Sequence, residues 1–481
     1  MKKIGLVSLG CPKNLVDSEV MLGLAQQSGL ELTRDPANAD VLVVNTCAFI
    51  DKAKQESVDT ILEMAEFKKT GACRTLIVTG CLAERYRDEL REQIPEIDAV
   101  LGTGQVPEIV GALGLDGSRP VTSAPLQLLR SNGEPVVFPG VPSPKPGAPV
   151  LEPQAPSPKP QALPTYLYDA DTPRLLATPR HYAYIKIAEG CDYKCGFCII
   201  PTLRGHYRSR PHDSIVREAR ELAARGVKEL LLISQDTTFY GNDRGERGAL
   251  ARLLRALNDV EGLQWIRLLY LYPTTIGDDV LDAMAELDKV CRYVDLPLQH
   301  ASDPVLKRMK RPGTRASYER LLDRIRRRMP DVTLRTTFIV GYPGETREDV
   351  DELLDFVGAM SFSHVGVFTY SHEEGTSAHG LTDDVTAAVK ERRRAAVMRR
   401  QRQIVTRANR ERTGHRVRLL VDGPSNEHDL VLRARSAGQA PDIDPVVYLT
   451  DCDPSLLSPG QFVDAEIVSS REYDLMARPL I

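Results

Sequence analysis

The chain has 481 residues, a length that exceeds one ordinary domain and indicates about three. Hydrophobic residues make up 42% of the chain and charged residues 27%, which is typical of soluble globular proteins. The sequence has neither a basic leader followed by an apolar core nor an apolar run of about twenty residues. We therefore expect a cytoplasmic protein, and the formal net charge of −4 does not indicate nucleic acid as a partner.

Strand and helix patterns alternate over residues 1–112. Short apolar runs rich in β-branched residues predict buried parallel strands at 3–9, 41–46 and 75–79. A helical pattern at 15–28 ends before Gly29, a residue typical of helix C-termini. The pattern predicts an α/β domain with a parallel sheet.

Residues 133–164 are rich in proline, and the motif PSPKP occurs at 142–146 and again at 156–160. Because apolar side chains are few and many N–H donors are missing, we expect an extended, partly polyproline-II linker. A docking ligand for another protein is the alternative interpretation.

The alternation of strands and helices returns within residues 177–408. Six strand candidates occur there, at 183–188, 229–234, 265–271, 292–296, 333–340 and 364–370. Six such units predict an open, partial (β/α)6 barrel instead of a closed eightfold one. An arginine-rich helix is expected over 384–410, with Val397, Ile404 and Ala408 along one face, and we interpret its arginines as a solvated surface.

The last part of the chain, residues 411–478, is rich in β-strand signals. Strands are expected at 416–421, 430–435, 445–449 and 461–467, and turn residues between them predict a small antiparallel β-barrel. Residues 411–481 contain seven arginines, no lysine and twelve acidic residues, a net charge of −5. A module that grips RNA phosphates should be basic, so this charge favours a basic protein partner, although solubility alone is an alternative explanation.

The motif CxxxCxxC follows the strand candidate 183–188 and consists of Cys191, Cys195 and Cys198. In a reducing cytosol such cysteines indicate metal binding or catalysis. Three thiolates can hold three irons of a 4Fe–4S cluster and leave the fourth iron without a protein ligand, as chemistry at a metal requires. A zinc site or isolated thiols are the alternatives, but no fourth ligand is near in sequence.

A second set of cysteines is dispersed along the first domain. Cys11, Cys47 and Cys81 each follow a different predicted parallel strand. Because the carboxyl ends of such strands share one edge of the sheet, we expect the three thiols to converge on one site. Separate buried thiols are the alternative, and we assign Cys73, Cys291 and Cys452 to that class.

These motifs resemble known families. CxxxCxxC with Phe197 before the third cysteine is similar to the radical S-adenosylmethionine (SAM) superfamily, and GCPKNLVDSE at 10–19, NTCAFI at 45–50 and TGC at 79–81 are similar to the methylthiotransferase family. The resemblance covers nearly the whole chain except the proline-rich segment. It implies an N-terminal iron–sulfur domain over 1–112, a radical SAM core over 177–408 and a TRAM β-barrel over 411–478.

The resemblance also implies cofactors and an activity. It implies two 4Fe–4S clusters, on Cys11, Cys47 and Cys81 and on Cys191, Cys195 and Cys198. One SAM would donate a methyl group to sulfur on the first cluster. A second SAM would be cleaved at the other cluster to a radical that abstracts hydrogen from the substrate carbon.

The family contains two kinds of substrate. Stretches at 11–19, 235–241, 296–313 and 440–449 resemble the branch that modifies the β-carbon of an aspartate in small-subunit ribosomal protein twelve. The partners implied are that protein, an electron donor such as flavodoxin or ferredoxin, and a sulfur donor. The alternatives are methylthiolation of a transfer-RNA adenosine and a non-catalytic iron–sulfur scaffold.

Several residues at expected strand ends are candidates for binding SAM. They are Gln235 and Asp236 after strand 229–234, Gly341 and Glu345 in the motif GYPGE, and Arg208 after the cysteine loop. Gln299 and His300 follow strand 292–296 and are weaker candidates. A tight strand-to-helix turn is the alternative for GYPGE, a structural hydrogen bond is the alternative for His300, and a solvated surface is the alternative for the arginines of RGHYRSR at 204–210, Arg208 among them.

Overall fold

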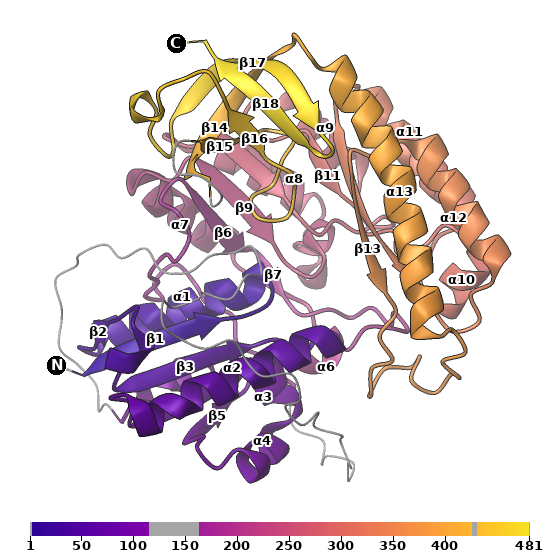
Figure 1. Ribbon diagram of the computed structural model, residues 1–481. Coiled ribbons are helices and arrows are strands. Elements are labelled where there is room, and N and C mark those ends of the chain that lie inside the picture. The colour runs from indigo at the N-terminus through magenta and orange to yellow at the C-terminus, as the bar shows by residue number, and fades with distance from the viewer. Residues whose placement is uncertain (1, 115–162, 426–430, 481) are drawn as a thin grey trace. The chain divides into compact units, whose positions relative to one another are not determined.

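The computed structural model describes residues 2–114, 163–425 and 431–480, and the chain forms two compact units (Figure 1). The first unit comprises Met1–Thr178, Ala188–Tyr193 and Cys198–Arg210, and the second comprises Pro179–Ile187, Lys194–Phe197 and Pro211–Ile481. All but the last two residues of the expected linker at 133–164 lie outside the described residues. None of the helices in the described part of the chain combines the length and the apolar character needed to cross a membrane.

The first unit is built on a five-stranded parallel sheet, which confirms the predicted fold. Its strands, in spatial order, are β2 (Glu31–Leu32), β1 (Lys3–Ser8), β3 (Val41–Thr46), β4 (Thr75–Gly80) and β5 (Ala99–Leu101). The strand order reverses direction between β1 and β3, which is the place where such sheets bind ligands. The residues of β3 are all buried, as expected for a strand covered on both faces.

Helices cover the sheet of the first unit. They are α1 (Pro12–Gln27), α2 (Asp51–Thr70), α3 (Cys81–Arg85), α4 (Arg87–Gln93), α5 (Ile109–Ala112) and α6 (Ile200–Arg204). Helix α1 starts earlier than expected because Pro12 occupies its first turn, where its missing N–H costs nothing. A two-stranded antiparallel ribbon, β7 (Ala188–Glu189) and β8 (Arg208–Ser209), completes this unit.

The second unit contains the six parallel strands that the sequence predicts. They are β6 (Tyr182–Lys186), β9 (Glu229–Ile233), β10 (Trp265–Leu268), β11 (Tyr293–Asp295), β12 (Thr333–Val340) and β13 (His364–Thr369). The strands form two three-stranded sheets, which an isolated parallel bridge between Ile266 and Val290 connects. This arrangement confirms the partial barrel.

Helices alternate with the barrel strands along the chain. They are α7 (His212–Ala224), α8 (Ala249–Asn258), α9 (Asp278–Glu286), α10 (Asp303–Arg308), α11 (Arg315–Arg328) and α12 (Arg347–Met360). Capping boxes, in which two side chains satisfy the free N–H groups, begin α11 at Thr314 and α12 at Thr346.

The long helix α13 (Ala387–Glu411) lies against β13 and α12 (Figure 1). The expected apolar face was partly wrong, because Ala408 is exposed and Ile404 is only half-buried. The buried face instead repeats every four residues through Val397, Gln401, Val405 and Asn409. The Gln401 amide donates a hydrogen bond to the carbonyl of Phe362 at 2.8 Å, so a polar residue is satisfied on the buried face.

The chain ends in a closed five-stranded barrel, as predicted. Its strands are β14 (Arg416–Pro424), β15 (Leu432–Ser436), β16 (Val447–Leu449), β17 (Phe462–Arg471) and β18 (Asp474–Pro479). The pairing of β16 with β18 is parallel and the other pairings are antiparallel. Strand β18 has no counterpart among the strands expected from the sequence.

Within the second unit, acidic residues hold the terminal barrel against the N-terminal ends of the parallel strands. The Asp442 carboxylate accepts a hydrogen bond from the Tyr182 hydroxyl at 3.1 Å, and that of Asp444 accepts one from Tyr293 at 2.6 Å. Arg435 bridges Asp422 at 2.8 Å and Glu229 at 2.7 Å. Part of the acidic charge of the terminal barrel is therefore used for packing within the unit.

Candidate functional site: two cysteine sites, each beside a buried arginine

The strand register of the first unit brings Cys11, Cys47 and Cys81 together. Thr46 pairs with Gly80 across β3 and β4, so Cys47 and Cys81 leave adjacent strands at the same level. Cys11 follows the neighbouring strand β1 and caps α1. A Cβ atom added to Gly10, which has φ of +86°, would lie 2.9 Å from the Cys47 Sγ atom. The chain therefore needs glycine at position 10.

Cys47 and Cys81 are buried and Cys11 is half-buried, and the three thiols influence one another. Burial, reinforced by the neighbouring thiols, raises the pKa of Cys47 to about 12. Burial also raises the pKa of Cys81 to about 11, against the opposing effect of Arg204. Cys47 and Cys81 are therefore protonated at neutral pH unless a cation holds their thiolates.

Arg204 reaches into this site from α6. Its side chain is 3% exposed, and one Nη atom lies 3.7 Å from the Cys81 Sγ atom and also donates a hydrogen bond to the Asn14 side chain. The other Nη atom lies 2.7 Å from the Asp17 carboxylate and 3.4 Å from that of Glu189. No local pattern in the sequence predicts that Arg204 contacts a cysteine.

The CxxxCxxC loop is shared between the two units. Cys191 and Cys198 belong to the first unit and Cys195 to the second. In the first unit, the Cys191 N–H donates to the Gly205 carbonyl at 3.1 Å. In the second, the Gly196 N–H donates to the Met309 carbonyl at 2.7 Å, and its carbonyl accepts from the Ala378 N–H at 2.8 Å.

Arg311 lies beside Cys195 within the second unit. Its guanidinium donates to the Cys195 Sγ atom at 3.8 Å and to the Pro297 carbonyl at 2.5 Å. The Tyr272 ring lies under the guanidinium, 3.9 Å from its central carbon to the ring centre. Cys195 therefore has a buried cationic donor, as Cys81 does.

Each triplet supplies three thiolates, a donor set that suits an iron–sulfur cluster. Among the described residues, no three His, Cys, Asp or Glu side chains lie close enough together to hold one metal ion. In a cubane cluster each thiolate binds a different iron atom, so the thiolates stand farther apart. Three soft thiolates, with a cationic donor to one of them, suit such a cluster.

The GYPGE residues form a tight turn after β12. The Glu345 carboxylate accepts a hydrogen bond from the Gly341 N–H at 2.7 Å and an ion pair from Arg393 at 2.8 Å, and His300 Nε2 lies 3.6 Å away. Contacts within the chain thus engage Glu345 on both oxygens, and its role toward SAM stays a prediction.

Other candidate SAM ligands also make contacts within the chain. Asp236 is fully buried and caps a short turn through the N–H groups of Thr238 at 2.9 Å and Phe239 at 3.2 Å. Gln235 is half-buried beside it. Gln299 adopts φ of +76° and pairs through its backbone with β12. These three residues and His300 follow the carboxyl ends of β9 and β11.

Arg208 is bound to the backbone of the first unit. One Nη atom donates to the carbonyls of Arg204 and His206, both at 2.9 Å, and the other donates to the Tyr166 carbonyl at 2.6 Å. A role in SAM binding therefore stays a prediction. The three remaining cysteines lie apart from both sites: Cys73 and Cys291 are buried in cores and Cys452 packs on the core of the terminal barrel.

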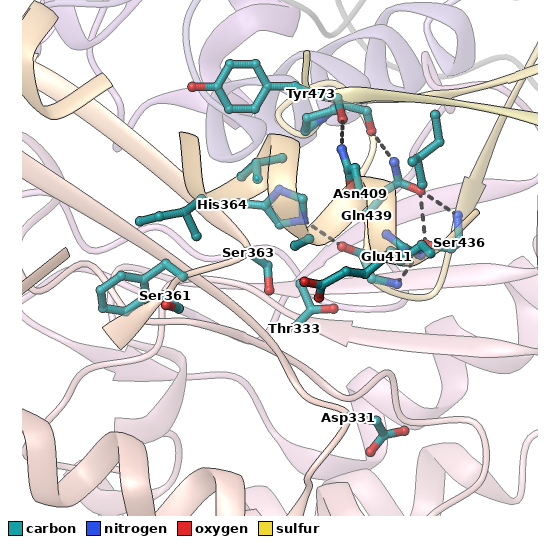
Figure 2. Close-up of a pocket in the computed structure, with 18 of the residues that line it drawn as sticks. Asp331, Thr333, Ser361, Ser363, His364, Asn409, Glu411, Ser436, Gln439 and Tyr473 are labelled. Carbon is teal, nitrogen blue, oxygen red and sulfur yellow. Dashed lines mark hydrogen bonds between the residues drawn. The ribbon is translucent and has the colours of Figure 1, made fainter. Parts of the chain in front are cut away.

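A sizeable cavity in the second unit lies elsewhere. It has a volume of about 1170 Å³ and is lined by residues of α13, the terminal barrel and the first residues of β10, β12 and β13. Figure 2 shows its polar lining, in which His364 bonds the Gly438 carbonyl at 2.9 Å and Asn409 bonds that of Tyr473 at 3.3 Å. Barrel enzymes work at the opposite, carboxyl ends of their strands, so this cavity is not the candidate site.

Three family descriptions match the chain. Residues 3–102 match the uncharacterized protein family UPF0004, residues 185–357 match the radical SAM superfamily and residues 413–480 match the TRAM domain. A solved structure of the radical SAM methyltransferase TsrM from Kitasatospora setae is similar with a TM-score of 0.50 and 19% identity, over 76% of this chain and 73% of that one. At this identity the likeness concerns the fold alone.

Curated relatives extend over the whole length. A protein of Koribacter versatilis named ribosomal protein uS12 methylthiotransferase RimO is 47% identical over 100% of this chain and 96% of its own length. A protein of the same name from Geotalea uraniireducens is 44% identical over 99% of this chain and 98% of its own length. Together with the cysteine pattern, these matches establish that the chain belongs to the RimO family of radical SAM methylthiotransferases.

Proposed function

We propose that this protein adds a methylthio group to the β-carbon of an aspartate in ribosomal protein uS12, in the cytoplasm, with two 4Fe–4S clusters and SAM. The observation that carries the proposal is the convergence of Cys11, Cys47 and Cys81 at one edge of a parallel sheet, in a chain that also has the CxxxCxxC motif. One triplet alone would suit many radical SAM enzymes. A second triplet suits an enzyme that must also supply sulfur.

Each triplet provides three ligands and so leaves one iron of a cubane open. When bound, the cluster on Cys191, Cys195 and Cys198 would bind and cleave SAM, and that on Cys11, Cys47 and Cys81 would carry the sulfur to be transferred. The residues of this chain hold the thiolates in place: Ser57 bonds the Cys47 N–H and carbonyl at 3.0 and 2.9 Å, and Asn14 bonds the Leu9 and Thr46 carbonyls. These bonds fix the backbone on which the thiols stand.

The names of the relatives support the uS12 substrate. The acidic composition of the terminal barrel supports it less strongly than the sequence suggested, because Asp422, Asp442 and Asp444 bond residues of the same unit. The remaining acidic residues are compatible with a basic protein partner. An electron donor such as flavodoxin or ferredoxin and a sulfur donor belong to the same proposal.

Anaerobic reconstitution of single-cysteine variants tests the proposal. Cys195→Ala should abolish SAM cleavage, whereas Cys47→Ala should retain SAM cleavage without methylthio transfer to uS12. Cys452→Ala, a cysteine outside both triplets, is the matched control and should keep both activities. Equal loss of both activities in Cys195→Ala and Cys47→Ala, with iron retained, would contradict separate roles for the two sites.

A transfer-RNA adenosine is the second candidate substrate. Arg399, Arg410 and Arg416 are exposed on α13 and at the start of β14, and exposed arginines attract phosphates. Mass spectrometry of uS12 and of transfer RNA from cells that lack this chain separates the candidates. Loss of the modification from transfer RNA with uS12 unchanged would replace the first candidate by the second.

A further inference from the structure

Each cysteine site contains one buried arginine that contacts one cysteine sulfur. Arg204 contacts Cys81 within the first unit at 3.7 Å, and Arg311 contacts Cys195 within the second unit at 3.8 Å. The two arginines come from different elements, α6 and the segment after α10. The same chemical arrangement therefore occurs once in each unit.

The two arginines differ in their counter-ions. Arg204 lies 2.7 Å from the Asp17 carboxylate and 3.4 Å from that of Glu189, and both acids are almost fully buried. Arg311 is 6% exposed, and no ion pair to a carboxylate joins it to any residue in the described part of the chain. Its Nε atom is also buried without a hydrogen-bond partner.

A buried guanidinium without an anion is costly, because the desolvation of its charge is not offset. The Tyr272 ring and the Pro297 carbonyl offset part of that cost. The sulfur of Cys195 is the contact that becomes anionic when the residue binds a metal. An anionic group at Cys195 would therefore complete the surroundings of Arg311.

We propose that Arg311 and Arg204 are positioning residues that donate a hydrogen bond to one cysteine sulfur at each cluster site, and that Arg311 alone adds net positive charge to its site. The inference rests on the proposed function, since it requires clusters on both triplets. Hydrogen bonds to cluster sulfurs and local charge set the reduction potential of such clusters. The site with Cys195 should thus accept an electron more readily than it would without Arg311.

Redox titration followed by electron paramagnetic resonance tests this inference on the full-length reconstituted protein. A Cys47→Ala background isolates the signal of the cluster on Cys191, Cys195 and Cys198. In this background Arg311→Gln should shift the midpoint potential to more negative values. Arg311→Lys should shift the midpoint potential less than Arg311→Gln does, because lysine keeps the positive charge but lacks the planar guanidinium group.

Arg204 in the first unit provides a matched comparison. A Cys195→Ala background isolates the signal of the cluster on Cys11, Cys47 and Cys81. Arg204→Gln alone removes the guanidinium that faces two buried acids, Asp17 and Glu189, and can fail to fold, so the double variant Arg204→Gln with Asp17→Asn is used. This double variant removes one charge of each sign and should shift the midpoint potential of its cluster less than Arg311→Gln shifts the other.

The outcomes separate the inference from the proposed function. If the wild type assembles two clusters but Arg311→Gln leaves the midpoint potential unchanged, the inference alone is overturned. A loss of thermal stability in Arg311→Gln without a shift in midpoint potential would assign Arg311 a purely structural role. Wild-type protein that assembles one cluster or none would overturn the proposed function and this inference with it.

Discussion

The Asp444 carboxylate accepts a hydrogen bond from the Tyr293 hydroxyl at 2.6 Å and thereby joins the terminal barrel to the first residue of strand β11. Its other oxygen lies 3.2 Å from Arg335. The Asp444 side chain is 1% exposed, so the pair is shielded from water. Asp444 belongs to the stretch 440–449, which resembles the uS12 branch of the family. At least one residue of that stretch therefore has a role in packing.

We expect Asp444→Asn to lower the free energy of unfolding by about 3 kcal/mol, because it leaves the half-buried Arg335 guanidinium with fewer anionic partners and removes the charged acceptor of the buried Tyr293 hydroxyl. Urea denaturation, followed by the fluorescence of Trp265 in β10, measures the change. The control is Asp451→Asn, an exposed residue at φ of +54° that asparagine tolerates, and it should change stability by less than about 0.5 kcal/mol. Equal losses in the two variants would argue against the packing role.

The same carboxylates predict that stability falls in acid. Burial would raise the pKa of Asp444, but His364 and Arg335 beside it hold the pKa below its ordinary value. Burial acts on Asp422 in the same way, and Arg435 with His181 lowers its pKa. Because the folded pKa is the lower one, these groups stabilise the fold above the unfolded pKa of about 3.9, and the stabilisation is lost as the pH falls below it.

Urea denaturation between about pH 3 and pH 6 measures this dependence. Asp444→Asn should lose less stability on acidification than the wild type, because it lacks one of the two carboxylates. An identical loss in both proteins would show that other groups govern acid sensitivity.

A methyl group at position 10 should disturb the cysteine site of the first unit. Gly10→Ala would place a Cβ atom 2.8 Å from that of Cys47 at φ of +86°, so the loop must move and separate Cys11 from Cys47. We expect the variant to assemble one cluster fewer in anaerobic reconstitution, measured as iron and sulfide per chain. Gly111→Ala, where nothing lies within 4 Å, is the control, and equal cluster content in all three proteins would contradict the expectation.

Arg208 should contribute to stability through its three backbone carbonyl partners. Arg208→Gln is expected to lower stability by about 2 kcal/mol, since hydrogen bonds of a charged group are lost, and a role in SAM binding would appear as weaker SAM affinity in the same variant. Thermal unfolding and equilibrium dialysis of SAM measure the two effects. The exposed Arg225→Gln is the control. Weakened SAM binding with unchanged stability would instead support the role expected from the sequence.

The sequence predicted those features that depend on local pattern. Strand 41–46 is found with the same bounds, and all six barrel strands are present, because buried parallel strands are short, apolar and β-branched. The convergence of Cys11, Cys47 and Cys81 followed from their positions after parallel strands, since the ends of such strands share one edge.

The features that escaped prediction depend on distant contacts. Arg204 and Cys81 are 123 positions apart in the sequence, and Arg311 and Cys195 are 116 positions apart. No local sequence pattern therefore indicates either contact. On α13, Gln401 and Asn409 occupy the buried face because backbone carbonyls accept their amide hydrogen bonds. An apolar pattern cannot identify that face. Strand β18 contains arginine and proline, which weakened its strand signal.

The terminal barrel is closed, because β17 pairs with both β14 and β18. A closed barrel leaves no row of free backbone N–H and C=O groups along an edge strand. The described strands of the barrel therefore offer no edge to which a protein partner could add a strand of its own. Any partner must be recognised through side chains and loops, so specificity for the partner can change by surface substitution without altering the strand register of the barrel.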